Sequence, residues 1–379
     1  MKKAFALFLS FAAAAALAAS ESVKNSEDWH ECTSWVVMPD LTAGKRMLLH
    51  KNRDSTTKSI CLYQVAEPGK FPWIAVSNNW RPSANMGLNS KGLAVVMNSG
   101  DPSDAISNPK GLDTTEMAAS ALANCATAEA AVKHLHELVK ARNYSHGASG
   151  SIWYVADSRR AFVIEHDALR FAFHEVPSGF SIRANSWHFP EMVIYSKRTP
   201  TQQVKHNRRE SAVRKYLFED GTKYKEVITP RKIHGASRID VFPEDPKCYP
   251  LCGNSTNSAA TISVDCEYPE MLSSIYAAFG PPRYTVYLPI PFVVDKLPEE
   301  LFKTEFSDAI FARRDARRDL LPMEKLVEFE RRMIQRHEEA VEKARAALKK
   351  GGSREDVQKI LSEAFHLNWD AVKTLCKGK

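Results

Sequence analysis

The stretch HECTSW, His30–Trp35, decides how this 379-residue chain is interpreted. It places a cysteine and two hydroxyl residues at the start of an extended run, WVVM, whose β-branched and aromatic residues favour a strand. A cysteine at such a place is ordinarily a small buried apolar residue. The first position of the first predicted strand also suits a nucleophile, and the rest of the chain has to decide between these two roles of Cys32.

The residues before this stretch predict a secretory signal. Residues 1–19, MKKAFALFLSFAAAAALAA, join two lysines to an apolar run that ends in small residues. A membrane anchor is the alternative, but the run is short, rich in alanine and followed by polar residues. We therefore expect a signal peptide at 1–19, a short linker or propeptide at 20–31, and a secreted or periplasmic protein with no membrane contact in its mature form.

The composition is that of a soluble globular protein, with 44% hydrophobic and 26% charged residues. The formal net charge of +7 raises the question of a nucleic-acid partner. The basic residues lie mostly in the C-terminal region and alternate with acids, as in ARRDARRD and EKARAALKK. This pattern is typical of solvated helix faces, so we expect no nucleic-acid partner.

The order of the predicted elements indicates an α+β fold. Extended runs fill much of residues 32–100, with a hairpin in MGLNSKGLAVVMNSG, and two helices follow at TTEMAASALAN and TAEAAVKHLHELVKARN. A second β block, a helix at RRESAVRKYLFE and further strands come next, and residues from 296 onward have helical periodicity. Strands, helices and strands in this order indicate a layered α+β domain at 32–295, not a parallel βαβ repeat, with a helical extension at 296–379.

Seven cysteines leave an odd thiol in an exported protein. Cys248, Cys252 and Cys266 lie near one another in the sequence, and a disulfide among them is left open. A zinc site there is disfavoured, because no histidine lies among them. Cys125 and Cys376 fall in helical patterns and are expected to be buried, which leaves Cys32 as the unusual cysteine.

A catalytic cysteine needs a base, and none lies beside Cys32 in the sequence. Cleavage between Glu31 and Cys32 would create one, since a free α-amino group has a pKa of about 7.7–8.0 and lies within reach of its own sulfur. The nucleophile and its base would then belong to one residue.

From Cys32 to about residue 295 the sequence resembles the N-terminal nucleophile hydrolases with a cysteine nucleophile, the group of choloylglycine hydrolase, penicillin V acylase and acyl-coenzyme A:6-aminopenicillanic acid acyltransferase. Five pieces carry the resemblance along with the opening CTSW, in the family's order: HKNRDS (50–55), MGLNSKGLAVVMNSG (86–100), YVADSRRAFVIE (154–165), RANSWHF (183–189) and AAFGPPRYTVYLPI (277–290). The resemblance implies a four-layer αββα sandwich and no cofactor or metal.

The resemblance also implies roles for individual residues. Cys32 is the nucleophile and Asp54 holds its α-amino group. Asn185, and Asn98 or its backbone amide, stabilise the oxyanion. Lys51 stands where bile salt hydrolases carry an arginine near the thiol. A later arginine of that family has its counterpart in the RRESAVRKY helix, where we expect Arg214 in preference to Arg209.

The function implied is an exported hydrolase of linear, non-peptide amides that acts on a small-molecule N-acyl amide through an acyl-cysteine intermediate. An acyltransferase or a cysteine dipeptidase on the same fold, and a non-enzymatic secreted binding module, are the alternatives. An apolar acyl pocket is expected from the aromatic residues of two loops, 64–83 and 186–205, and assembly of identical chains is left open. The aromatic residues concerned are Phe71, Trp73, Trp80, Trp187 and Phe189.

Overall fold

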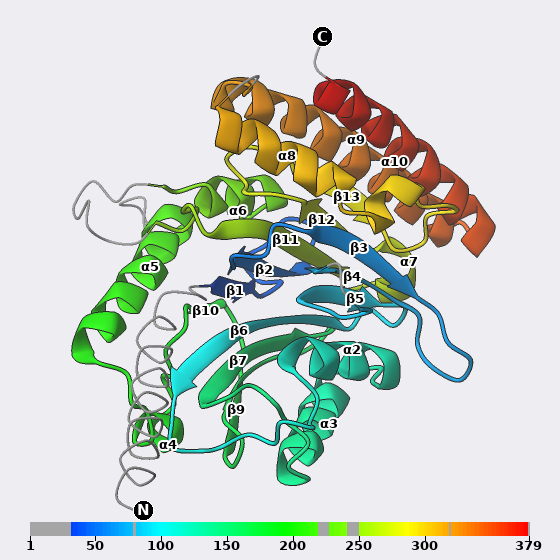
Figure 1. The fold of residues 1–379 in the computed structure, drawn as a ribbon. Coiled ribbons are helices and arrows are strands. Elements are labelled where there is room, and N and C mark those ends of the chain that lie inside the picture. The colour runs from blue at the N-terminus through cyan, green and yellow to red at the C-terminus, as the bar shows by residue number, and fades with distance from the viewer. Residues whose placement is uncertain (1–31, 79–80, 219–226, 241–249, 318–319, 378–379) are drawn as a thin grey trace, which may run out of the picture.

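The structure of the chain, a computed structural model, describes residues 32–78, 81–218, 227–240, 250–317 and 320–377 (Figure 1). The predicted signal peptide, the linker up to Glu31, and the residues Trp80 and Cys248 lie outside the described residues. No helix of the described part is both long enough and apolar enough to cross a membrane.

Two antiparallel sheets form the centre of the molecule. The first has the strand order β10 (Phe180–Arg183), β1 (Thr33–Val37), β2 (Arg46–Asp54), β11 (Thr256–Asp265), β12 (Ser274–Ala278) and β13 (Leu288–Pro291). The second runs β3 (Ile60–Val65), β4 (Trp73–Asn78), β5 (Met86–Asn89), β6 (Ala94–Pro102), β7 (Ser149–Ala156), β8 (Ala161–His166) and β9 (Phe171–Glu175). Their facing sides bury one apolar core, which includes Val36, Leu49 and Val96.

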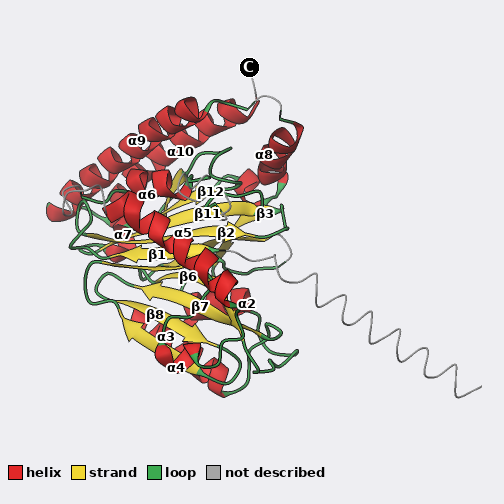
Figure 2. Cartoon of the chain, turned by 90° about the vertical axis from the view of Figure 1, so that its left-hand side faces the viewer, coloured by secondary structure: helices red, strands yellow, loops and turns green. Residues whose placement is uncertain are grey.

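Helices cover the outer face of each sheet (Figures 1 and 2). The second sheet carries α2 (Thr114–Asn124) and α3 (Ala128–Lys140), and the first carries α5 (Pro200–Phe218) and α6 (Pro230–Ser237) together with two C-terminal helices. The remaining short elements are α4 (Pro190–Val193), α7 (Pro269–Leu272) and η1 (Glu299–Phe302). The prediction of a four-layer αββα sandwich is confirmed.

Local signals in the sequence explain where elements begin and turn. Asp113 and Glu116 form a capping box at the start of α2, and the Thr127 side chain caps α3 by accepting a hydrogen bond from Ala130 N. The β5–β6 hairpin turns at Gly92, whose φ of 79° is unfavourable for a residue with a side chain. The capping residues fix where α2 and α3 begin, and Gly92 fixes the turn between β5 and β6.

In the C-terminal region α9 (Met323–Lys349) and α10 (Arg354–Lys377) pack on the first sheet, and α8 (Glu305–Ala316) packs against β3 at the edge of the second sheet. In α9 the apolar residues Leu326, Met333, Val341 and Ala344 are buried, and Leu348 is half-buried. The helices α9 and α10 pack against each other and against β13.

One buried carboxylate joins α9 to the sandwich. Glu330 accepts hydrogen bonds from Arg238 Nη2 at 2.6 Å, from Tyr287 N at 2.8 Å and from His234 Nδ1 at 3.0 Å. Burial opposes its charge, but the Arg238 guanidinium and the hydrogen bonds lower the pKa of Glu330 to about 2. The extension is therefore anchored through a fully desolvated ion pair as well as through apolar contacts.

Candidate active site

Strand register places Cys32 opposite an arginine. In the β1–β2 pair Thr33 faces Asn52 and Ser34 faces Lys51, so the next step back along β1 brings Cys32 across from Arg53. Side chains alternate along a strand, and cross-strand partners share a face. Cys32, Ser34, Lys51 and Arg53 therefore share the face toward the second sheet, and the Cys32 side chain is buried there, with 4% of its surface exposed.

The Lys51 ammonium lies between the thiol and β6. Its Nζ donates a hydrogen bond to the carbonyl oxygen of Met97. Burial lowers the pKa of Lys51 to about 8, while the charge of the Cys32 sulfur and a hydrogen bond to it act in the opposite direction. The structure thus places the positive charge of Lys51 beside the sulfur of Cys32.

Arg53 is a second cation at the thiol, which the sequence analysis did not identify. It is 7% exposed, its Nε donates to Asn85 Oδ1 at 3.1 Å, and its Nη1 has no hydrogen-bond partner among the described residues. Burial lowers the pKa of Arg53 to about 10, and the Cys32 and Asp54 charges oppose this effect, so the guanidinium stays protonated at neutral pH. The two-residue spacing from Lys51 on one strand was the signal that could have found it.

The arginine that contacts Cys32 from the outer layer is Arg209, and the prediction of Arg214 is wrong. Arg209 Nη1 donates to the carbonyl oxygen of Cys32 at 3.4 Å, and its Nη2 donates to Asp54 Oδ2 at 2.9 Å. Arg214 is exposed, with its guanidinium 4.9 Å from the ring centre of Phe180. Five residues on a helix turn the side chain by about 140°, so only one of these arginines of α5 can face the sheet.

Asp54 lies at the end of β2, on the face covered by α5. Besides Arg209, it accepts a hydrogen bond from Thr256 Oγ1 at 2.6 Å, and Thr256 is its partner in the register with β11. The carboxylate is 1% exposed and is linked to the Cys32 backbone through one guanidinium. This connection ties the end of β2 to the start of β1, where the nucleophile was predicted.

Asn98 holds backbone groups together and has no side-chain donor left for an oxyanion. Its Nδ2 donates to the carbonyl oxygens of Arg183 at 3.1 Å and Ala184 at 2.9 Å, which uses both amide hydrogens. Its Oδ1 accepts a hydrogen bond from Ser34 Oγ at 2.6 Å. The predicted oxyanion role of the Asn98 side chain is therefore wrong, and the backbone amide named as its alternative stays a prediction.

Asn185 retains capacity for a ligand. Its Nδ2 donates to the carbonyl oxygen of Ser99 at 2.8 Å, which uses one of two amide hydrogens. Its Oδ1 is buried with no hydrogen-bond partner among the described residues. A buried polar atom without a partner is costly unless something else occupies the site in the working protein.

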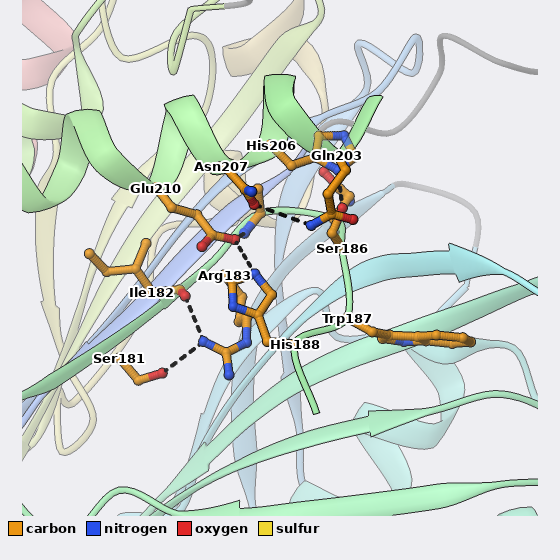
Figure 3. A network of polar contacts seen from close by, with 12 residues as sticks. Ser181, Ile182, Arg183, Ser186, Trp187, His188, Gln203, His206, Asn207 and Glu210 are labelled. Atoms are coloured by element: carbon orange, nitrogen blue, oxygen red, sulfur yellow. Dashed lines mark hydrogen bonds and ion pairs between the residues drawn. The ribbon is translucent and has the colours of Figure 1, made fainter. Parts of the chain in front are cut away.

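Side chains of α5 hold the segment that carries Asn185, and Figure 3 shows them pointing toward it. His206 Nδ1 lies 2.6 Å from Ser186 Oγ, and burial lowers the pKa of His206 to about 2, so its ring is neutral. Glu210 accepts from Ala184 N at 2.8 Å and lies 3.2 Å from His188 Nε2. One helix thus positions both Asn185 and the Arg209 that contacts Cys32.

The structure also places the other cysteines, the aromatic residues of the two loops and the possible metal ligands. Cys252 and Cys266 are free thiols and do not pair with each other, and Cys125 is buried at the end of α2. Trp73 and Trp187 are 3% and 1% exposed and belong to the cores of the sandwich, so their expected place in an acyl pocket is wrong. Among the described residues no group of three or more His, Cys, Asp or Glu side chains is arranged to hold a metal ion.

Comparison with solved structures finds similarity to amide-cleaving enzymes. Penicillin V acylase from Agrobacterium tumefaciens aligns with a TM-score of 0.43 at 16% identity, covering 66% of this chain and 84% of the acylase. An N-acylethanolamine-hydrolyzing acid amidase ortholog from Caenorhabditis elegans aligns at 0.40 and 12%, covering 63% and 94%. A conjugated bile acid hydrolase variant from Clostridium perfringens aligns at 0.37 and 11%, covering 70% and 91%.

The sequence itself matches no protein-family model and no curated protein sequence. At identities of 11–16%, these alignments concern the fold alone.

Proposed function

We propose that this protein is a hydrolase of linear, non-peptide amides that works through an acyl-cysteine intermediate on Cys32. The observation that carries the proposal is the pair of buried cations, Lys51 and Arg53, on the strand that faces this cysteine. A thiol next to fixed positive charge is a stronger nucleophile than an ordinary cysteine, because the thiolate is the attacking species. A merely structural cysteine gains nothing from such neighbours.

The base in this mechanism is the α-amino group of Cys32, freed by removal of the residues up to Glu31. Asp54 orients that amine, in the way that a third group orients the base of a catalytic triad. Arg209, which donates to both Asp54 and the Cys32 carbonyl oxygen, keeps the two groups in register. The chain carries out the acid–base chemistry with no metal or organic cofactor.

The reaction then proceeds in two steps. The Cys32 sulfur attacks the amide carbon, and the second amide hydrogen of Asn185 donates to the oxygen that becomes negative. The α-amine passes the thiol proton to the leaving nitrogen as the C–N bond breaks. Water, deprotonated by the same amine, attacks the thioester and releases the carboxylic acid, which restores the thiol.

The substrate in this proposal is a small-molecule N-acyl amide. The solved structures that resemble this one are named for the cleavage of penicillin V, N-acylethanolamines and conjugated bile acids, all of which are linear amides. We further propose that residues 1–19 direct export, so that the mature enzyme is secreted or periplasmic and begins at Cys32.

The test is a mass and activity measurement on the exported protein. The intact mass and N-terminal sequence should place Cys32 first, and the protein should hydrolyse at least one of those three amide types. Cys32→Ala should abolish hydrolysis, while Cys266→Ala, which removes a half-buried thiol elsewhere, should leave it unchanged. An active chain that retains Glu31, or full activity of Cys32→Ala, would rule out the mechanism.

A further inference from the structure

The surroundings of Cys32 contain more positive than negative charge. Three buried cations, Lys51, Arg53 and Arg209, lie around it, with one carboxylate, that of Asp54. Arg209 and Asp54 form an ion pair at 2.9 Å. Lys51 and Arg53 remain, and both face the thiol from the same side of β2.

Neighbouring carboxylates are engaged with other arginines. Glu165 pairs with Arg183 at 3.0 Å, and Asp101 pairs with Arg198. Asn85, the hydrogen-bond partner of Arg53, is neutral, and its own Nδ2 donates to Ser77 Oγ at 3.0 Å. Within the described residues, Arg53 therefore has a polar contact that fixes its direction but no carboxylate paired with it.

Counting the charges near Cys32 at each stage of the proposed reaction shows that a neutral substrate would leave the positive charge of Arg53 without a negative partner. The proposed reaction has at most one negative charge near Cys32, first on the thiolate and then on the oxygen of the tetrahedral intermediate. Lys51 balances that single charge, and the acyl-enzyme carries none. The freed α-amine adds no negative charge, so Arg53 would stay uncompensated at each stage. Buried charges are rarely tolerated without a partner.

From the unpartnered Nη1 and this excess charge we infer that Arg53 binds an anionic group of the substrate, such as a carboxylate, close to the amide bond that is cleaved. The inference rests on the proposed function and narrows its substrate class to N-acyl amides that carry a negative charge. A guanidinium whose Nε is already held by Asn85 presents its remaining donors in a fixed fork, which suits a carboxylate.

Alkylation of Cys32 tests this without any amide substrate. Iodoacetate and iodoacetamide transfer nearly identical groups to sulfur, and only the first is negatively charged. We expect the ratio of the iodoacetate rate to the iodoacetamide rate to fall at least about tenfold in Arg53→Gln. Arg53→Lys should keep most of the ratio, and the exposed Arg214→Gln should keep all of it. Rates at Cys32 are measured by peptide mass spectrometry.

An unchanged ratio in Arg53→Gln overturns the inference, and so does a wild-type Cys32 that reacts with neither reagent. If the Arg53→Gln variant does not fold, the wild-type protein alone can test whether an anion binds beside Cys32. Sodium acetate should then slow alkylation by iodoacetamide more than equal concentrations of acetamide or sodium chloride, and equal effects of the three overturn the inference. If the wild-type protein hydrolyses none of the amides, but its ratio of iodoacetate to iodoacetamide rates falls as expected in Arg53→Gln, the proposed function is refuted and the anion site is supported.

Discussion

Replacing the buried carboxylate of α9 should destabilise the whole sandwich. In Glu330→Gln the guanidinium of Arg238 loses its counter-ion, and the new amide nitrogen turns its donors toward the donor of either His234 or Tyr287. The pKa of Glu330 is about 2, against an ordinary 4.5. This difference of about 2.5 corresponds to about 3 kcal/mol of folding free energy, within the range of about 3–5 kcal/mol found when one partner of a buried ion pair is removed.

Urea denaturation measures this loss. The variant should lose about 3 kcal/mol of unfolding free energy at pH 7 with an unchanged m-value, and Glu339→Gln, an exposed change on the same helix, should lose less than about 0.5 kcal/mol. Because the folded pKa is depressed, the advantage of the wild type is complete above pH 4.5 and declines as the pH falls toward 2, to roughly 2 kcal/mol at pH 3.5. A loss below about 1 kcal/mol at pH 7, or a loss that does not change between pH 5 and pH 3.5, would refute the reasoning.

Two further predictions concern the thiol and its support. Lys51→Met should slow the alkylation of Cys32 by iodoacetamide about tenfold at neutral pH, since one charge beside the sulfur is lost, and the effect should shrink above pH 8, where Lys51 loses its proton; an unchanged pH–rate profile would contradict this. Asn98→Ala should cost about 2–4 kcal/mol in thermal or urea denaturation, because two buried carbonyl groups and the Ser34 hydroxyl lose their partner. A stability within about 0.5 kcal/mol of wild type would show that these bonds are not needed.

Periodicity and turn residues were sufficient to predict most of the sandwich. The helix at TTEMAASALAN (114–124) has the predicted bounds, and the hairpin predicted in MGLNSKGLAVVMNSG forms from β5 and β6, because capping, apolar spacing and turn residues are local properties of the sequence. The short helix α6 was missed, since eight residues with an internal glycine give little periodicity. Of the predicted later strands, β13 is only four residues long, because Pro289 and Pro291 limit its pairing.

The candidate site was predictable only in part. The resemblance to a known family named Cys32, Lys51 and Asp54, and the register of the β1–β2 pair, which brings Arg53 to the same face as Lys51, is seen only in the structure. The choice between two arginines of α5 depends on which face of the helix meets the sheet, which the sequence did not reveal. The bonds of Asn98 span 64 to 86 residues of chain, and no local pattern indicates them.

The hydrogen bonds of the Asn98 amide determine when in folding the active site can become complete. This amide belongs to β6 in one sheet, yet it binds Ser34 of β1 and the end of β10 in the other. A chain in which only one sheet has formed therefore lacks the hydrogen bonds of Asn98 that align the segment of Asn185 with the thiol of Cys32. In the proposed scheme the active site is therefore complete only once the two sheets have packed together, whenever the residues up to Glu31 are removed.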